Sequence, residues 1–306
     1  MGKSKLKIEL EYLPVRLLLG VFRAVPLRLG LWLGPALGGW AYYFVSGRLR
    51  RTGEQNLQHA FPNLSERERA ALLRGCFRNF GRLLVAFSHF NAGNLDRLKR
   101  FVECDGLERI DAARAQGRGV ILFTGHLGAW ELTSFALSMF GRPLSFLVRR
   151  IDNPKIEALI DPFRTRLGNR TINKLSAARE MLHTLRKGGT LGILVDLNTH
   201  EHEGIFVDFF GLQASTTFIL AKLAMRTGAP VLPVFAPWDA KRRRFLIKVD
   251  EPLALSRTGD EEDDARQLTQ CFTKVVEEYV RLYPDQWLWI HRRWKTRPDG
   301  EAGIYR

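Results

Sequence analysis

A histidine and a glutamate stand five residues apart in this chain, directly after a short apolar run. The segment reads Gly-His-Leu-Gly-Ala-Trp-Glu from Gly125 to Glu131, and the apolar run occupies residues 120–124. The imidazole of His126 can take up a proton near neutral pH. The Glu131 carboxylate can accept a hydrogen bond from the other ring nitrogen if the turn folds back. We predict that this pair removes a proton from a hydroxyl group.

Two glycines frame this histidine. Gly125 and Gly128 permit a tight turn and a close approach of the backbone to a ligand, so we predict both as substrate-binding positions. Free N–H groups at the start of the following helix could stabilise a developing oxyanion. A histidine that caps the helix or packs in the core is the alternative interpretation of His126 taken by itself.

The elements that must position these residues are indicated by apolar runs. Five such runs have the length of buried strands, and helical segments with recognisable ends lie between them. This alternation predicts an α/β fold with a largely parallel central sheet flanked by helices. His126 then follows a strand at the carboxyl edge of the sheet, where open α/β sheets bind their ligands. The runs are residues 120–124, 144–148, 191–195, 231–235 and 245–249.

Capping signals indicate where the helices begin and end. Ser65 and Glu68 form a capping box, and the apolar spacing that follows predicts a long amphipathic helix to about Phe90. Asn153 followed by Pro154 predicts another helix start. Further helices are predicted between Ser176 and Gly188, between Ser215 and Gly228, and over residues 263–282.

The first fifty residues are predicted to form a membrane-associating segment, and residues 51–306 the catalytic domain. Residues 29–47 carry no charge, which is close to the length of a bilayer span, but Pro35 and five glycines interrupt the run. A clean crossing, a shallow or hairpin-like insertion, and a buried hairpin in a soluble core are the three interpretations. The glycines at four-residue intervals, Gly30, Gly34 and Gly38, could also let another helix approach closely.

The chain is strongly basic. Lys and Arg number 47 against 32 Asp and Glu, a formal net charge of +15, so the partner should be acidic: a nucleic acid, an anionic membrane or an acidic carrier protein. The three cysteines are odd in number and form no CxxC pair, which argues against a disulfide scaffold and a zinc ribbon.

Two clusters of charged residues need an interpretation. His200-Glu201-His202-Glu203 lacks the spacing of a helical metal site, so we interpret residues 200–203 as a solvated loop edge and expect no metal. Arginines and tryptophans alternate over residues 287–297, which would suit an interfacial belt or a carrier-docking surface and superficially also a nucleic acid.

Several blocks of the chain, in the same order, resemble one family. The His-x4-Glu segment resembles the signature of the glycerolipid-type acyltransferases. The fuller string His-Leu-Gly-Ala-Trp-Glu is similar to the version in the late lipid A acyltransferases, lauroyl or myristoyl transferases, of Gram-negative bacteria. An arginine four residues before Asn-Pro is matched by Arg149. The further matching blocks lie at residues 148–154, 189–196, 204–211, 214–216, 228–234 and 284–295.

The resemblance implies an O-acyltransferase. His126 would deprotonate an acceptor hydroxyl, Glu131 would orient the imidazole, and the alkoxide would attack the carbonyl of an acyl thioester. Arg149 would bind a phosphate, with Asn153 in the same substrate-binding block, and Asp196 would help to hold the site. The implied donor is an acyl carrier protein thioester and the implied acceptor a lipid A precursor, with no cofactor, no metal and no nucleic acid. The implied location is the cytoplasmic face of the inner membrane, where thioester carriers reside.

One departure leaves the acceptor open. Leu197 follows Asp196, where family members often have Gln or His. Acylation of another glycolipid or phospholipid from an acyl-coenzyme A donor is therefore an alternative. A basic membrane-binding protein without enzyme activity is a second alternative, but it gives no reason for His126 and Glu131 at a strand end. We find no Gly-x-Ser-x-Gly elbow, which argues against a serine hydrolase.

Overall fold

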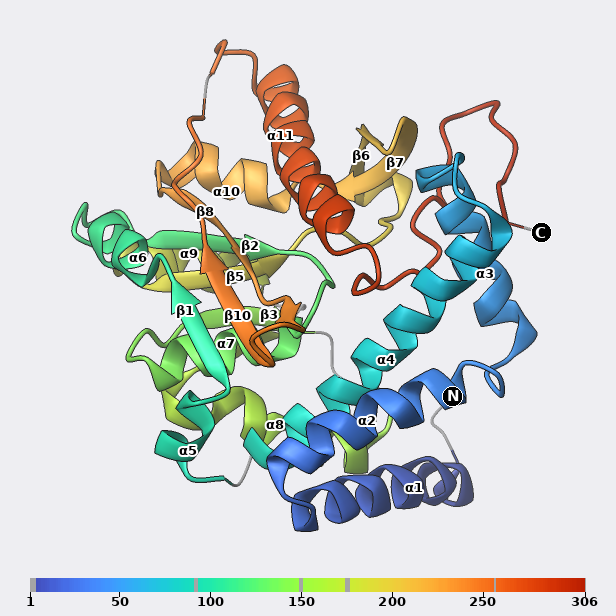
Figure 1. Cartoon of the computed structure of the whole chain (residues 1–306). Helices are drawn as coiled ribbons and strands as arrows, with labels where there is room; N and C mark the ends of the chain where they lie inside the picture. The colour runs from blue at the N-terminus through green and yellow to red at the C-terminus, as the bar shows by residue number, and fades with distance from the viewer. Residues whose placement is uncertain (1–3, 91–92, 149–150, 174–176, 256, 306) are drawn as a thin grey trace.

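A largely parallel sheet forms the centre of the protein (Figure 1). The computed structural model describes residues 4–90, 93–148, 151–173, 177–255 and 257–305. Along the order β1-β10-β8-β2-β5-β3-β4, neighbouring strands run parallel except β10 and β8. The predicted α/β fold is therefore confirmed. The strands are β1 (Val102–Asp105), β2 (Val120–Thr124), β3 (Ser145–Val148), β4 (Arg170–Asn173), β5 (Thr190–Leu194), β8 (Val231–Phe235) and β10 (Arg244–Val249), with β9 (Trp238–Asp239) paired to β10.

Helices cover both faces of this sheet. Side chains of β2 alternate between two cores: Ile121 and Phe123 pack with α9, α10 and α11, whereas Val120 and Leu122 pack with α6 and α7. Burial on both faces explains why the strands are uninterrupted apolar runs. The helices are α1 (Lys5–Ala24), α2 (Leu27–Ala41), α3 (Gly47–Ala60), α4 (Glu66–Phe90), α5 (Leu95–Lys99), α6 (Leu107–Arg114), α7 (Trp130–Met139), α8 (Pro154–Thr165), α9 (Ala177–Arg186), α10 (Ile219–Thr227) and α11 (Glu261–Leu282).

The long helix α4 packs against the N-terminal helices α1, α2 and α3 and also against α7, which flanks the sheet. Its predicted capping box is present: the Ser65 backbone N–H donates to Glu68 Oε2 at 2.7 Å. Glycines of α2 allow this helix to pack closely on α4, because a Cβ on Gly34 would lie 2.6 Å from the carbonyl oxygen of Gly81. The four-residue glycine spacing thus serves a helix contact within the chain.

One stretch predicted as the start of a helix is a strand. Ser215 lies in β7 (Leu212–Thr217), which pairs antiparallel with β6 (Gly204–Phe209) in a separate hairpin. The helix begins only at Ile219, although it ends at Gly228 as predicted. The hairpin packs against α11, and this tertiary contact outweighs the local signal for a helix cap at Ser215.

The N-terminal helices present many apolar side chains to the outside. Of the thirteen large hydrophobic residues that are exposed in the described residues, twelve lie between Leu6 and Phe44, and Leu282 is the other. α1 runs along the edge of the molecule beside α2 and α8 (Figure 1). Among the described helices, none is both long enough and apolar enough to cross a membrane.

Candidate active site

His126 and Asp196 meet at the carboxyl edge of the sheet. β2 and β5 are parallel neighbours, with Thr124 opposite Leu194, so the residues that follow these strands lie side by side. Nδ1 of His126 lies 2.7 Å from Oδ1 of Asp196, and the backbone N–H of His126 donates to Oδ2 at 2.6 Å. One carboxylate therefore fixes both the ring and the backbone of the histidine.

Asp196 is a buried carboxylate that stays ionised. Burial by itself would raise the pKa of Asp196, but the charge and hydrogen bonds of His126, together with Trp287, lower this pKa from 3.8 to about 2. The Nε1–H of Trp287 donates to Oδ2 at 2.7 Å. In a neutral imidazole, this ionised acceptor favours the tautomer of His126 with the proton on Nδ1, in which Nε2 keeps its lone pair. This is the tautomer that a general base needs.

The prediction that Glu131 orients the imidazole was wrong. Nη2 of Arg164 donates to Oε1 of Glu131 at 3.0 Å, and Nε donates to Oε2 at 3.3 Å. Asp196 already binds Nδ1 of His126, and a two-point contact with a permanent cation engages both oxygens of Glu131. Arg164 lies in the last turn of α8, which packs beside α7, so the pair joins these two helices.

The two glycines of the turn contact the protein itself. A Cβ on Gly125 would lie 2.9 Å from Oδ2 of Asp196, so glycine lets that carboxylate approach. Gly128 has a φ of 62°, and a Cβ there would overlap the carbonyl of Ala236. The N–H groups of residues 126–129 donate to Asp196, Gly125, Gln286 and Ala236. These four donors are occupied within the protein. The N–H groups expected to stabilise an oxyanion are those at the start of α7, which begins at Trp130, so that expectation stays a prediction.

Of the two residues predicted to bind the substrate in the Arg-x3-Asn-Pro block, the described structure includes only Asn153. Arg149 lies outside the described residues. Asn153 is 1% exposed and does not line the cavity beside His126. Its Oδ1 accepts from the N–H groups of Lys155 and Ile156, which caps α8, and its Nδ2 binds α1. The prediction of Asn153 as a substrate-binding residue was therefore wrong in its geometry, because all its bonds are made to other parts of the chain.

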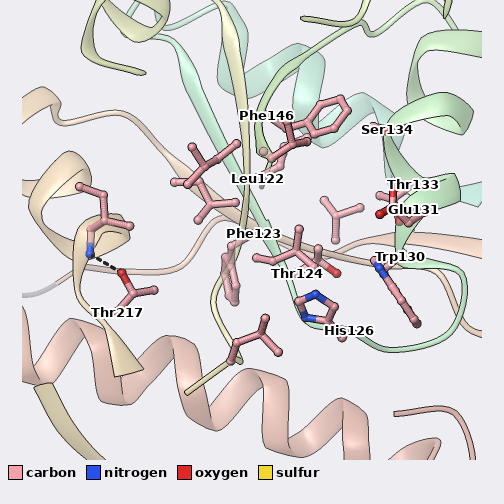
Figure 2. A pocket seen from close by; sticks show the side chains of 18 of the residues that line it. Leu122, Phe123, Thr124, His126, Trp130, Glu131, Thr133, Ser134, Phe146 and Thr217 are labelled. Carbon is pink, nitrogen blue, oxygen red and sulfur yellow. Dashed lines mark hydrogen bonds between the residues drawn. The ribbon is translucent and has the colours of Figure 1, made fainter. Parts of the chain in front are cut away.

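A cavity of about 570 Å³ opens beside His126. Figure 2 shows the histidine next to Thr124 and Trp130, with Glu131 on the neighbouring helix turn. The inner wall is apolar, whereas the remainder of the lining is mostly polar and includes Glu131 and Arg164. Its apolar side chains come from strands on both sides of β2 and from α7, and include Leu122, Leu137, Leu144, Phe146 and Val234. The other polar members are Thr133, Ser134, Asn198, Thr199, His200, Glu203 and Thr217.

The C-terminal block supports this site from behind instead of forming a surface belt. Trp287, Trp289, Trp294 and Arg293 are all at most 1% exposed, so the predicted interfacial belt or docking surface was wrong for these four residues. Nη1 of Arg293 donates to the carbonyl of Ser215 at 2.8 Å. The block therefore pins the β6–β7 hairpin and supplies the Trp287 hydrogen bond to Asp196.

A second histidine near the site is held neutral. Burial lowers the pKa of His291 to about 4, although the charge of Asp196 acts in the opposite direction. Nε2 of His291 accepts from the backbone N–H of Asn198 at 3.1 Å, and the Asn198 side chain bonds Thr296. Asn198 thus fastens the C-terminal block to the strand end. Within the described residues, no group of three or more His, Cys, Asp or Glu side chains could hold a metal ion.

Comparison with known proteins identifies the family. The model of the bacterial lipid A biosynthesis acyltransferases matches residues 4–296. The chain belongs to this family. A lipid A biosynthesis lauroyltransferase of Escherichia coli is 31% identical, with 89% of this chain and 87% of the relative covered. A lipid A biosynthesis acyltransferase of Haemophilus influenzae is 28% identical over 90% of this chain and 85% of the relative. A myristoyltransferase of Escherichia coli is 26% identical over 85% and 81%. The protein is therefore an O-acyltransferase.

Two residues of this acyltransferase's site were missed by the sequence analysis. Arg164 sits on α8 without a motif of its own, and only its helical position ten residues after Pro154 could have pointed to the α7 side. Trp287 belongs to the C-terminal block, where the alternation of basic residues and tryptophans predicts a surface. The clustering of Trp287 with two other tryptophans, Trp289 and Trp294, was a signal for burial, and a buried indole N–H needs an acceptor.

Proposed function

We propose that this acyltransferase moves a fatty acyl chain from an acyl carrier protein thioester onto a hydroxyl of a lipid A precursor. The observation that carries the proposal is the His126–Asp196 pair beside a largely apolar cavity of about 570 Å³. The family supports acyl transfer to a lipid acceptor. An acyl thioester is already activated, so the reaction requires no cofactor and no metal.

His126 acts as the base in this proposal. Nε2 takes the proton of the acceptor hydroxyl, and the oxygen attacks the carbonyl carbon of the thioester. The imidazolium that forms is stabilised by the ionised carboxylate of Asp196 at 2.7 Å. The C–S bond then breaks, the ester remains on the acceptor, and the carrier thiolate takes the proton back from Nε2.

Different parts of the cavity suit the acyl chain and the acceptor. Its apolar inner wall, with Leu137, Leu144 and Phe146, suits an acyl chain, because burial of each methylene contributes about 0.8 kcal/mol. Glu131 and Arg164 lie in the same cavity. A Glu131 carboxylate held by Arg164 can accept a hydrogen bond from an acceptor hydroxyl, and we assign this pair to orienting the acceptor towards His126.

We also propose that the enzyme works at the cytoplasmic face of the inner membrane. The exposed apolar residues between Leu6 and Phe44 support contact with lipid, and the net charge of +15 favours anionic headgroups. An acceptor that resides in the bilayer would then be reached without leaving it.

A transfer assay tests the proposal. Purified protein would be incubated with a tetra-acylated lipid A precursor and either acyl carrier protein thioesters or acyl-coenzyme A thioesters, and the mass of the lipid measured. We expect one added acyl chain from the carrier protein donor, and none with His126→Ala or Asp196→Asn. If an acyl chain is added only from acyl-coenzyme A, the proposed donor is wrong. If an acyl chain is added only to a phospholipid extract, the proposed acceptor is wrong.

A further inference from the structure

A single buried amide joins the N-terminal helix to a wall of the active site. Nδ2 of Asn153 donates to the carbonyl of Ile8 at 2.9 Å and to Oε2 of Glu11 at 3.0 Å. An ion pair between Lys155 and Glu9 lies beside it, and the Lys155 ammonium is 5.3 Å from the Tyr12 ring centroid. These contacts fasten α1 to the first turn of α8.

The same amide also begins α8. Oδ1 of Asn153 accepts from the N–H groups of Lys155 at 3.1 Å and Ile156 at 3.3 Å, which is the geometry of an N-cap. The far end of this twelve-residue helix carries Arg164, which is 7% exposed and binds Glu131. A movement of α8 would therefore move the Arg164–Glu131 pair in the cavity.

The opposite face of α1 carries an apolar stripe. Its leucines are 54% to 71% exposed, whereas Ile8 and Glu11 on the α8 side are half-buried. Lys5, Lys7, Arg16 and Arg23 on the same helix are exposed. Apolar residues at helical spacing beside exposed basic residues suit a helix that lies in the surface of an anionic bilayer. The stripe is formed by Leu6, Leu10, Leu13 and Leu17, with Val21 one turn further.

We propose that Asn153 is a positioning residue through which membrane-bound α1 sets the Arg164–Glu131 pair. An anionic bilayer holds α1, Asn153 holds α8 against α1, and α8 holds Arg164 on Glu131. Acyl transfer then accelerates when α1 lies on a bilayer, even if neither substrate is in that bilayer. This inference rests on the proposed function, because it assigns a regulator to the same site.

The variant Asn153→Asp separates the two bonds of the amide. Aspartate keeps the oxygen that caps α8 but places a carboxylate against the Ile8 carbonyl and the Glu11 carboxylate. The double variant Asn153→Asp with Glu11→Gln exchanges donor and acceptor and restores the side-chain contact between the helices. Glu11→Gln alone is the matched control.

Activity would be measured with a soluble short-chain thioester and a soluble acceptor, with and without phosphatidylglycerol–phosphatidylethanolamine vesicles that contain neither substrate. We expect the vesicles to accelerate the native enzyme about tenfold, the effect of one contact to a charged group. Asn153→Asp should bind vesicles normally and keep the rate without vesicles, but lose the acceleration, and the double variant should regain it. An equal loss with and without vesicles would show a merely structural role and overturn the proposal, as would an acceleration that survives in Asn153→Asp.

Hydrogen exchange tests the same coupling without turnover. Vesicles should slow exchange over residues 154–165 in the native protein and not in Asn153→Asp. If the native protein transfers no acyl chain but shows this protection, the proposed function fails and the coupling stands. If residues 154–165 exchange at the same rate with and without vesicles, the coupling is overturned whatever the activity.

Discussion

His126 and Asp196 contact each other across the ends of two adjacent parallel strands, with 2.7 Å between Nδ1 and Oδ1. They are seventy residues apart in sequence, and the register of β2 and β5 brings them together. The same carboxylate accepts the backbone N–H of His126 and the indole N–H of Trp287. The base and its orienting group are thus built into the sheet, and the helix that carries Glu131 contributes a different part of the site.

Replacing Asp196 by Asn should remove most activity while the fold is kept. An amide can donate to Nδ1, which favours the tautomer whose Nε2 carries the proton and cannot act as a base. In a serine protease the equivalent change costs roughly 10⁴-fold, so we expect a loss of 10³-fold or more in kcat. Asp299→Asn, at an exposed aspartate, is the control. A kcat within tenfold of the native value would exclude Asp196 as the partner of the base.

The acid stability of the protein should depend on Asp196. Its pKa falls from 3.8 in the unfolded chain to about 2 in the folded protein, so the ionised carboxylate stabilises the fold above pH 3.8. This contribution, on the order of 2 kcal/mol, should be lost as the pH falls towards 2. Urea unfolding between pH 6 and pH 2 measures it. In His126→Ala burial should raise the pKa of Asp196, so stability should begin to fall at a higher pH; identical curves would contradict the coupling.

Gly128 should tolerate no side chain because a Cβ there would overlap the backbone of Ala236. Gly141, which also has a positive φ but open space around it, is the matched control. Gly128 and Gly141 both have positive φ angles, 62° and 80°, but a Cβ would overlap Ala236 only at Gly128, and at Gly141 it would meet nothing within 4 Å. Gly141→Ala should cost about 1 kcal/mol of unfolding free energy from backbone strain alone. Gly128→Ala should cost about 3 kcal/mol or more. Equal losses in urea unfolding would mean that strain alone explains both.

The sheet could be predicted because its signal is local. Residues 120–124 and 231–235 are apolar except for Thr124, because these strands are buried at every position, and the predicted bounds match β2 and β8. The partner of His126 is not a local property. Proximity in sequence favours Glu131, five residues away, as the partner, whereas Asp196 becomes the partner only when the strand register is known.

The wrong predictions for Asn153 and Trp287 have a common cause, because both side chains form hydrogen bonds with segments that are distant in sequence. Asn153 looked like a substrate ligand because it stands in a family block, but α1, about 145 residues earlier, satisfies its amide. The basic residues after Trp287 predict a surface position, whereas the indole packs on Phe209 of the hairpin and donates to Asp196. The nearby sequence identifies neither hydrogen-bond partner, α1 for Asn153 or Asp196 for Trp287.

Gly192 should set the length of the acyl chain that the enzyme prefers. It lines the apolar wall of the cavity, and a Cβ there would lie 2.7 Å from Cδ1 of Leu144. Gly192→Ala should therefore fill space at this wall and favour shorter chains, whereas Phe146→Ala should favour longer ones. One methylene in an apolar pocket changes kcat/KM by roughly 10- to 200-fold. Competition among carrier thioesters of graded length measures the shift, and an unchanged preference in both variants would place the acyl chain elsewhere.

The apolar stripe of α1 should contribute to membrane binding, whereas the exposed Leu282 on α11 should not. Leu13 and Leu17 are 54% and 68% exposed on α1, and Leu282 is 67% exposed at the end of α11. Replacing Leu13 and Leu17 together by Ser should weaken binding to anionic vesicles by roughly 100-fold or more, since each leucine contributes about 1.5 kcal/mol or more when buried in lipid. Leu282 is similarly exposed, but Leu282→Ser should leave vesicle binding unchanged. Co-sedimentation with vesicles at low and high salt measures both effects, because the basic residues of α1 should add a part that salt removes. If Leu282→Ser weakens binding as much as the pair on α1, the membrane-facing surface lies at α11 and the role given to α1 is wrong.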